Sequence, residues 1–200
     1  MVTKESKLVL SMTSIYLVRH AHANWEPSEE RPLSDRGRAA ARLLAERLGE
    51  LSISAIYSSP ARRAVQTVTP LAEAHGFSPV IVPDLREREL VVASGMTFET
   101  AVQAAWRDPQ TAGGGGESNE AGAARGVRVL RRILSSHQHQ SIVVSTHGNL
   151  LALMLNHLDP SYGHEAWRAL TFPDVFRLTF QDQALLQRER VWTETTGDLT

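Results

Sequence analysis

Short apolar runs alternate with amphipathic stretches along this chain, and the apolar runs predict buried strands. The first run begins at Ile15 and stops abruptly at the cationic pair Arg19-His20. The strongest run is Ile142-Val143-Val144, within 141–145. Further strands are expected at 53–57, 79–82, 175–180 and 184–191, the last two as an antiparallel pair joined by the turn at 181–183.

Apolar positions at helical spacing predict helices between these strands. They are expected at about 35–50, from Pro60 to His75-Gly76, within 91–108, after Ser118 or Asn119, after Gly148 and within 162–170. Ser34 should cap the first helix, and Ser59 should cap the second, where Pro60 would take the first helical position. In the helix after Ser118, we expect the arginines at 125, 128, 131 and 132 to form the solvent-facing side.

Alternating strands and helices favour an α/β fold, a three-layer α/β/α sandwich with a mainly parallel sheet and an antiparallel edge strand. The expected organisation is an N-terminal extension over 1–13, one domain over 14–193 and a polar tail over 194–200. Deletion of residues 1–11 is predicted to leave activity intact.

Composition then narrows the class of protein. The chain has 200 residues, 42% hydrophobic and 22% charged, with a formal net charge of -1, which predicts a soluble globular protein without a nucleic-acid or membrane partner. It contains no cysteine, which excludes disulfides and thiolate chemistry. No apolar stretch is long enough to span a bilayer, and the first residues are too charged for a signal peptide, so a cytoplasmic location is expected. The oligomeric state stays open.

The candidate catalytic and binding residues lie where the predicted strands end. In a parallel sheet the carboxyl ends of the strands share one edge, which is where ligands bind in open α/β folds. That edge would bring together Arg19, His20, Arg63, Glu87 and His147. Two imidazoles, two guanidiniums and a carboxyl group suit an anionic substrate and proton transfer.

The ordered set of motifs resembles the histidine phosphatase superfamily, also called the phosphoglycerate mutase-like family. The matching stretches are Leu17-Val18-Arg19-His20, Pro32-Leu33-Ser34 with Gly37, Ser58-Ser59-Pro60 with Arg63-Ala64 and Gln66-Thr67, Leu85-Arg86-Glu87, Gly116-Glu117-Ser118 and Ser145-Thr146-His147-Gly148. They cover roughly 14–150 in the order of the family.

The resemblance implies a metal-independent phosphomonoesterase that needs no cofactor and acts on a small phosphorylated metabolite. His20 would be the nucleophile that becomes a phosphohistidine, and Arg19 and Arg63 would bind the phosphoryl oxygens. His147 would support the same group, and Glu87 would be the general acid. Such roles agree with phosphoryl transfer, in which the protein contributes mainly positioning and charge stabilisation.

Several alternatives remain at this point. The same core could serve a 2,3-bisphosphoglycerate-dependent phosphoglycerate mutase, or a non-catalytic phosphate-binding module. Glu89 rivals Glu87 as the general acid. The pairs His20/His22 and His137/His139 have the spacing of metal ligands, but arginines beside the first and the polar turn around the second favour no metal site.

The chain departs from the family pattern just after the nucleophile. Ala21 replaces the usual Gly, and His22 and Ala23 stand where a small acidic residue and Thr are usual. Glu26 replaces an Asn, and Asn24 is the expected substitute as a phosphate contact. The alcohol half of the substrate should be recognised by 90–116 and 160–175, in which no motif is readable.

Overall fold

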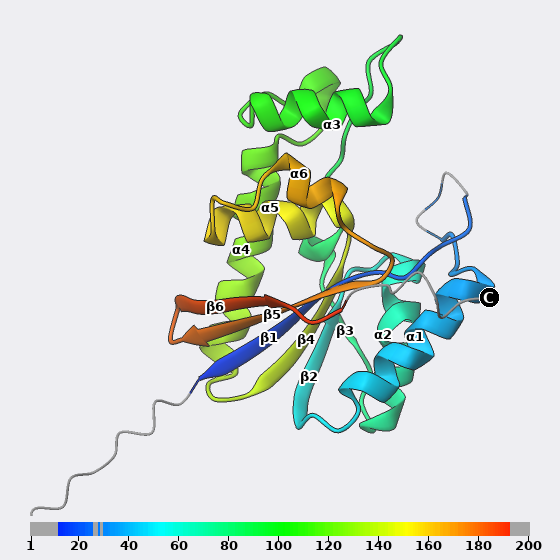
Figure 1. The fold of residues 1–200 in the computed structure, drawn as a ribbon, viewed down its shortest axis with the longest axis vertical. Coiled ribbons are helices and arrows are strands. Elements are labelled where there is room, and N and C mark those ends of the chain that lie inside the picture. Colours follow the sequence, from blue (N-terminus) through cyan, green and yellow to red (C-terminus); the bar gives the residue numbers. More distant parts are fainter. Residues whose placement is uncertain (1–11, 26–27, 29, 193–200) are drawn as a thin grey trace, which may run out of the picture.

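The computed structural model describes residues 12–25, 28 and 30–192, and it contains a six-stranded mixed sheet (Figure 1). The strands are β1 (Thr13–Arg19), β2 (Ile53–Ser58), β3 (Val80–Ile81), β4 (Ser141–Thr146), β5 (Asp174–Gln181) and β6 (Ala184–Arg190). Their order across the sheet is β3-β2-β4-β1-β5-β6. The first four in this order pair in parallel, whereas β5 is antiparallel to both β1 and β6. The predicted sandwich with an antiparallel edge strand is confirmed.

Helices cover both faces of the sheet (Figure 1). They are α1 (Asp35–Leu48), α2 (Arg62–Ala74), α3 (Phe98–Arg107), α4 (Asn119–Ser136), α5 (Gly148–Leu158) and α6 (His164–Arg168), with 3-10 turns at Pro83–Leu85 and Gly113–Gly115. In the described part of the chain no helix is long and apolar enough to cross a membrane.

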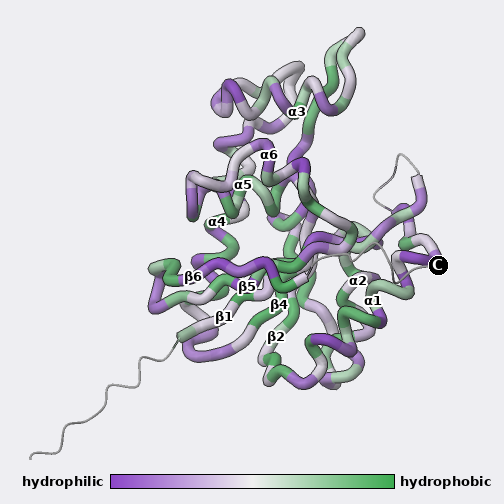
Figure 2. The backbone as a smooth tube through the Cα atoms, viewed as in Figure 1, coloured by the Kyte–Doolittle hydropathy of each residue, from purple (hydrophilic) through white to green (hydrophobic). Residues whose placement is uncertain are grey.

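The central strands are buried on both faces because their side chains alternate between two cores. Leu17 of β1 and Val144 of β4 pack on the side of α4 and α5, whereas Val18 and Val143 pack on the side of α1 and α2. Figure 2 shows hydrophobic residues gathered in β4 and mainly hydrophilic ones in the edge strand β6. The alternation therefore explains the three layers.

Some predicted boundaries are wrong. Helix α2 begins at Arg62 rather than Pro60, and its N-cap is Ala61 rather than Ser59. The helix expected within 91–108 is present as Phe98–Arg107, and it begins after Thr97, which caps it and accepts a hydrogen bond from the amide of Thr100. The predicted cap Ser34 is confirmed, and of the two candidates Ser118 and Asn119 it is Ser118 that caps α4, as each serine side chain accepts from an amide in the first turn.

The turn that carries His137 and His139 is also confirmed, with His139 exposed at a φ of 62°. His137 has protein partners at both ring nitrogens, the Tyr57 hydroxyl at 2.7 Å and Gln140 Oε1 at 2.8 Å. Residues 1–11 and 194–200, on which the expected extension and tail depend, lie outside the described residues.

Candidate active site

His20 follows the last residue of β1 and is 4% exposed. Its main-chain amide donates to Thr146 O at 3.0 Å, so the strand pairing with β4 continues into the site. Its Nδ1 lies 2.7 Å from Ala21 O. Because a carbonyl can only accept, Nδ1 carries the proton and the lone pair of the neutral ring lies on Nε2.

The pKa of His20 is lowered to about 3. Burial is the main cause, and the positive charges of Arg63, Arg19 and Arg31 contribute to the same lowering. The bond to Ala21 O raises the pKa but does not offset these effects. His20 is therefore a neutral imidazole at physiological pH, which is the form a nucleophile requires.

His147 lies at the end of β4, with its ring centroid 5.2 Å from that of His20. Arg63 Nη2 donates to His147 Nδ1 at 3.2 Å, so the ring proton lies on Nε2, which donates to Ser59 Oγ at 2.7 Å. Burial first, and then the neighbouring His20 and Arg63, hold the pKa of His147 well below its usual value. Ser59 thus orients this imidazole instead of capping α2 as predicted.

Arg19 ends β1 and reaches toward the loop between α6 and β5. Its Nη1 donates to Leu170 O at 3.0 Å, and its guanidinium carbon lies 3.4 Å from the ring centroid of Phe172. Gly148 allows this approach, because a Cβ there would lie 3.0 Å from Arg19 Nε. Burial lowers the pKa of Arg19 to about 10, so the side chain stays charged at neutral pH.

Glu87 lies against the N-terminus of α5. Its carboxylate accepts hydrogen bonds from the amides of Arg88 at 2.8 Å, Asn149 at 3.1 Å and Leu150 at 2.9 Å, and from Asn149 Nδ2 at 3.3 Å. The free N–H groups of a helix N-terminus stabilise negative charge in this position. Glu89, the rival acid, is exposed and does not line the site cavity.

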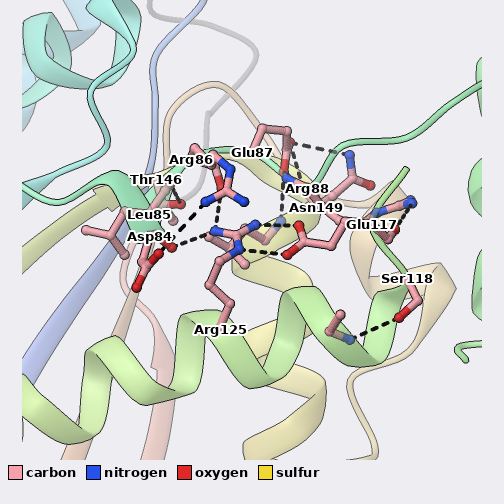
Figure 3. Close-up of polar contacts among 12 residues, drawn as sticks. Asp84, Leu85, Arg86, Glu87, Arg88, Glu117, Ser118, Arg125, Thr146 and Asn149 are labelled. Atoms are coloured by element: carbon pink, nitrogen blue, oxygen red, sulfur yellow. Dashed lines mark hydrogen bonds and ion pairs between the residues drawn. The ribbon is translucent and has the colours of Figure 1, made fainter. Parts of the chain in front are cut away.

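The segment before Glu87 is held by Arg125 of α4, as Figure 3 shows. Arg125 donates to both carboxylate oxygens of Glu117, at 2.7 and 2.6 Å, and its Nη1 donates to Asp84 O at 2.6 Å and Arg86 O at 3.1 Å. Thr146 Oγ1 fixes the same segment by donating to Leu85 O at 2.8 Å. The Glu of the Gly-Glu-Ser motif therefore binds the arginine that supports the Glu87 segment.

The prediction that all four arginines of this helix face solvent is wrong for Arg125, which is 4% exposed, whereas Arg128, Arg131 and Arg132 are exposed. Burial alone would raise the pKa of Glu117, but the hydrogen bonds and charge of Arg125 lower it below its usual value. Both partners are thus charged, and the ion pair spans the Glu87 segment and α4.

A cavity of about 710 Å³ opens over these groups. Its lining includes Arg19, His20, Glu87, Arg88, Asn149 and Phe172. Arg63 and His147 are buried and do not line it. Asn24 does not line it either, because its side chain is exposed while its amide bonds to Pro32 O at 3.0 Å. The structure therefore does not bring Asn24 to the site as expected.

Sequence reasoning missed Arg31, which lines the cavity and whose charge lowers the pKa of both His20 and His147. The Arg31-Pro32-Leu33 sequence offered a signal, since Arg31 immediately precedes a family motif. Arg88 and Phe172 were missed as well, and neither belongs to a readable pattern.

The residues after His20 that differ from the family pattern make local hydrogen bonds. The Ala21 amide donates to Thr67 Oγ1 at 2.9 Å, and His22 Nδ1 lies 2.8 Å from Ser34 Oγ. Gly37 permits α1 to begin here, because a Cβ would lie 2.0 Å from His22 O. Glu26 lies outside the described residues. Within 12–25, 28 and 30–192, no group of three His, Asp or Glu side chains could hold a metal ion.

Comparison with known proteins agrees with this geometry. The family model of the histidine phosphatase superfamily (branch 1) matches residues 15–184, and the chain belongs to this superfamily. It is 32% identical to phosphoglycerate mutase-like protein 4 of Arabidopsis thaliana, over 89% of this chain and 84% of that protein. It is 31% identical to a metal-independent phosphoserine phosphatase of the same plant, over 74% of this chain and 70% of that protein.

A solved structure shares the fold as well. A mycobacterial glucosyl-3-phosphoglycerate phosphatase in complex with inorganic phosphate has a TM-score of 0.71 and 25% identity, covering 91% of this chain and 97% of that one. These findings support a phosphomonoester hydrolase that acts on a small metabolite.

Proposed function

We propose that the protein hydrolyses a small phosphomonoester without a metal ion, through a phosphohistidine on His20. The observation that carries this proposal is the neutral His20, whose Nδ1 is bonded to Ala21 O and which lines a cavity beside Arg19 and Glu87. Family membership supports the same chemistry.

In the first step, His20 Nε2 attacks phosphorus and the bond between phosphorus and the alcohol oxygen breaks. Arg19 binds the phosphoryl oxygens as charge spreads over them, because a planar guanidinium can bind two oxygens at once. Arg63 is buried outside the cavity lining and adds positive charge beside His20. His147 accepts a hydrogen bond from Arg63 Nη2 and so holds this guanidinium near His20. The leaving alkoxide takes a proton from Glu87, which lines the cavity together with His20 and acts as the general acid.

In the second step, water attacks the phosphohistidine and gives its proton to the Glu87 carboxylate. Inorganic phosphate leaves, and His20 returns to its neutral form with the proton on Nδ1. Both steps need Glu87 on the alcohol side of the phosphoryl group. The bonds from the α5 amides hold its carboxylate at the cavity wall.

An assay with p-nitrophenyl phosphate, with and without EDTA, tests the proposal. We expect wild-type hydrolysis to be unaffected by EDTA and His20→Ala to be inactive, with His157→Ala, an exposed histidine on α5, as the matched control. Labelled phosphate should remain on acid-quenched wild-type protein and not on His20→Ala. Loss of activity in EDTA, or full activity of His20→Ala, contradicts the proposal.

A phosphoglycerate mutase is the second candidate, because relatives with that name match this chain. Conversion of 3-phosphoglycerate that depends on 2,3-bisphosphoglycerate would identify it, and phosphoserine belongs in the same panel because of the relative named for it. We further propose a cytoplasmic location, which cell fractionation tests.

A further inference from the structure

One wall of the active-site cavity is aromatic. Trp25, Phe98, Trp167 and Phe172 all line the cavity, although they come from four separate segments of the chain. The ring centroid of Phe172 lies 5.5 Å from that of His20, and the centroids of Phe98 and Trp167 lie 6.5 Å apart. The aromatic surface therefore begins next to the nucleophile and continues outward to α3 and α6.

Two of these side chains are largely open to solvent. Trp25 is 86% exposed and Phe98 is 53% exposed. Large aromatic side chains gain the most from burial, so leaving them open beside a reactive group costs stability unless a ligand covers them. Both lie in the lining of the same cavity, which points to the alcohol half of a substrate as the group that covers them.

The charged side chains that line the cavity further restrict which alcohol groups can bind there. Among the described residues that line the cavity, Arg19, Arg31 and Arg88 are cationic and Glu87 is the one acidic side chain. The Glu87 carboxylate already accepts four hydrogen bonds from Arg88, Asn149 and Leu150. An ammonium group on the substrate would therefore meet three guanidiniums against a single carboxylate.

We propose that the preferred substrate is a phosphomonoester of an alcohol that carries a flat aromatic group and no cationic group. This inference rests on the proposed phosphatase function and specifies its substrate class. The phosphoryl group lies at His20 and Arg19, while the aromatic group packs against the part of Phe172 that Arg19 does not cover and reaches Trp167 and Phe98. Offset or edge-on stacking fits rings that are spaced and tilted as these are.

Three substrates with unactivated alcohols test the preference, because a difference among them reflects recognition of the alcohol rather than the quality of the leaving group. They are 2-phenylethyl phosphate, ethyl phosphate and phosphoserine. For the wild type we expect kcat/KM to be at least about tenfold higher for 2-phenylethyl phosphate than for either of the others, as expected from one new aromatic contact. A wild type that prefers phosphoserine overturns the inference.

Variants locate the preference on the aromatic wall. Trp167→Ala and Phe98→Ala should each lower the ratio of kcat/KM for 2-phenylethyl phosphate to that for ethyl phosphate, by about five- to tenfold. Phe77→Ala is the control, because Phe77 is a half-exposed ring outside this cavity, stacked on His75. An unchanged ratio in both cavity variants overturns the inference.

The two proposals fail in different ways. If no phosphate ester is hydrolysed, or if hydrolysis survives in His20→Ala, the phosphatase proposal is wrong. If ethyl phosphate and phosphoserine are hydrolysed in a His20-dependent way without any preference for the aromatic ester, the substrate inference alone is wrong.

Discussion

Two glutamates two positions apart, Glu87 and Glu89, have very different surroundings. Glu87 lines the cavity and is bound by the amides at the start of α5, whereas Glu89 is exposed and uses its main-chain carbonyl to accept from the Glu117 amide at 2.8 Å. The local sequence of alternating charges does not separate the two. The separation comes from β4 and α5, which are distant in the chain.

Substitution at these positions tests which carboxyl group protonates the leaving alcohol. Glu87→Gln should lower kcat about 100-fold or more for alkyl phosphates, the size typical of a lost general acid, and much less for p-nitrophenyl phosphate, whose leaving group needs no proton. Glu89→Gln is the matched control and should behave as wild type. The reverse pattern would assign the proton to Glu89.

Residue identities at strand ends were predictable, but contacts between distant residues were not. His20, His147 and Arg63 follow from the rule that parallel strands end at one edge, together with the family motifs. Ser59 was expected to cap α2 because the local sequence suits an N-cap. In the structure its hydroxyl group is hydrogen-bonded to His147 instead. Arg125 looked solvent-facing because helical spacing does not reveal a partner such as Glu117, which lies in the loop before the helix.

At the scale of elements, α4 and the segment before Glu87 are joined by the buried Arg125–Glu117 ion pair. Removing one partner of a buried pair leaves the other charge without compensation, which costs about 3–5 kcal/mol. Arg125→Met should therefore lower the free energy of unfolding by about 3 kcal/mol, measured by urea denaturation. Arg128→Met, an exposed position on the same helix, should change it little. Equal losses in the two variants would contradict this role.

The same pair should position Glu87 for catalysis. A milder variant, Arg125→Lys, keeps the charge but cannot bind both Glu117 oxygens and two carbonyls in the same plane. We expect kcat to fall for alkyl phosphates more than for p-nitrophenyl phosphate, since only the former need the Glu87 proton. An equal fall for both substrates would indicate a structural role alone.

Element types were predicted more reliably than element ends. The alternation of apolar residues identified the strands, because their side chains fill two cores in turn. The ends of the helices depended on single contacts, such as the Thr97 cap, after which α3 begins at Phe98. The aromatic cavity wall was not predictable, because its four residues come from separate loops and helices with no shared spacing.

At the scale of the whole molecule, two neutral histidines buried side by side couple folding to pH. The pKa of His20 is lowered to about 3 and that of His147 is lowered well below 6.5, mainly by burial, whereas both should titrate near 6.5 once unfolded. Between these values the unfolded chain binds more protons than the folded one, so stability rises with pH. For both histidines the contribution is complete above about pH 6.5 and is lost as the pH falls below it, for His20 as the pH falls toward 3.

Each histidine should therefore remove up to about 1.4 kcal/mol from the free energy of unfolding for every pH unit below 6.5. Urea denaturation of the wild type at pH 7.0 and pH 5.5 measures the sum of all titrating groups, and His20→Gln removes one buried imidazole from it. We expect His20→Gln to lose stability less steeply over this interval than the wild type, and His157→Gln, at an exposed position, to keep the wild-type slope. A wild-type slope in His20→Gln would mean that His20 has the same pKa folded as unfolded, and it would contradict the lowering of that pKa by burial.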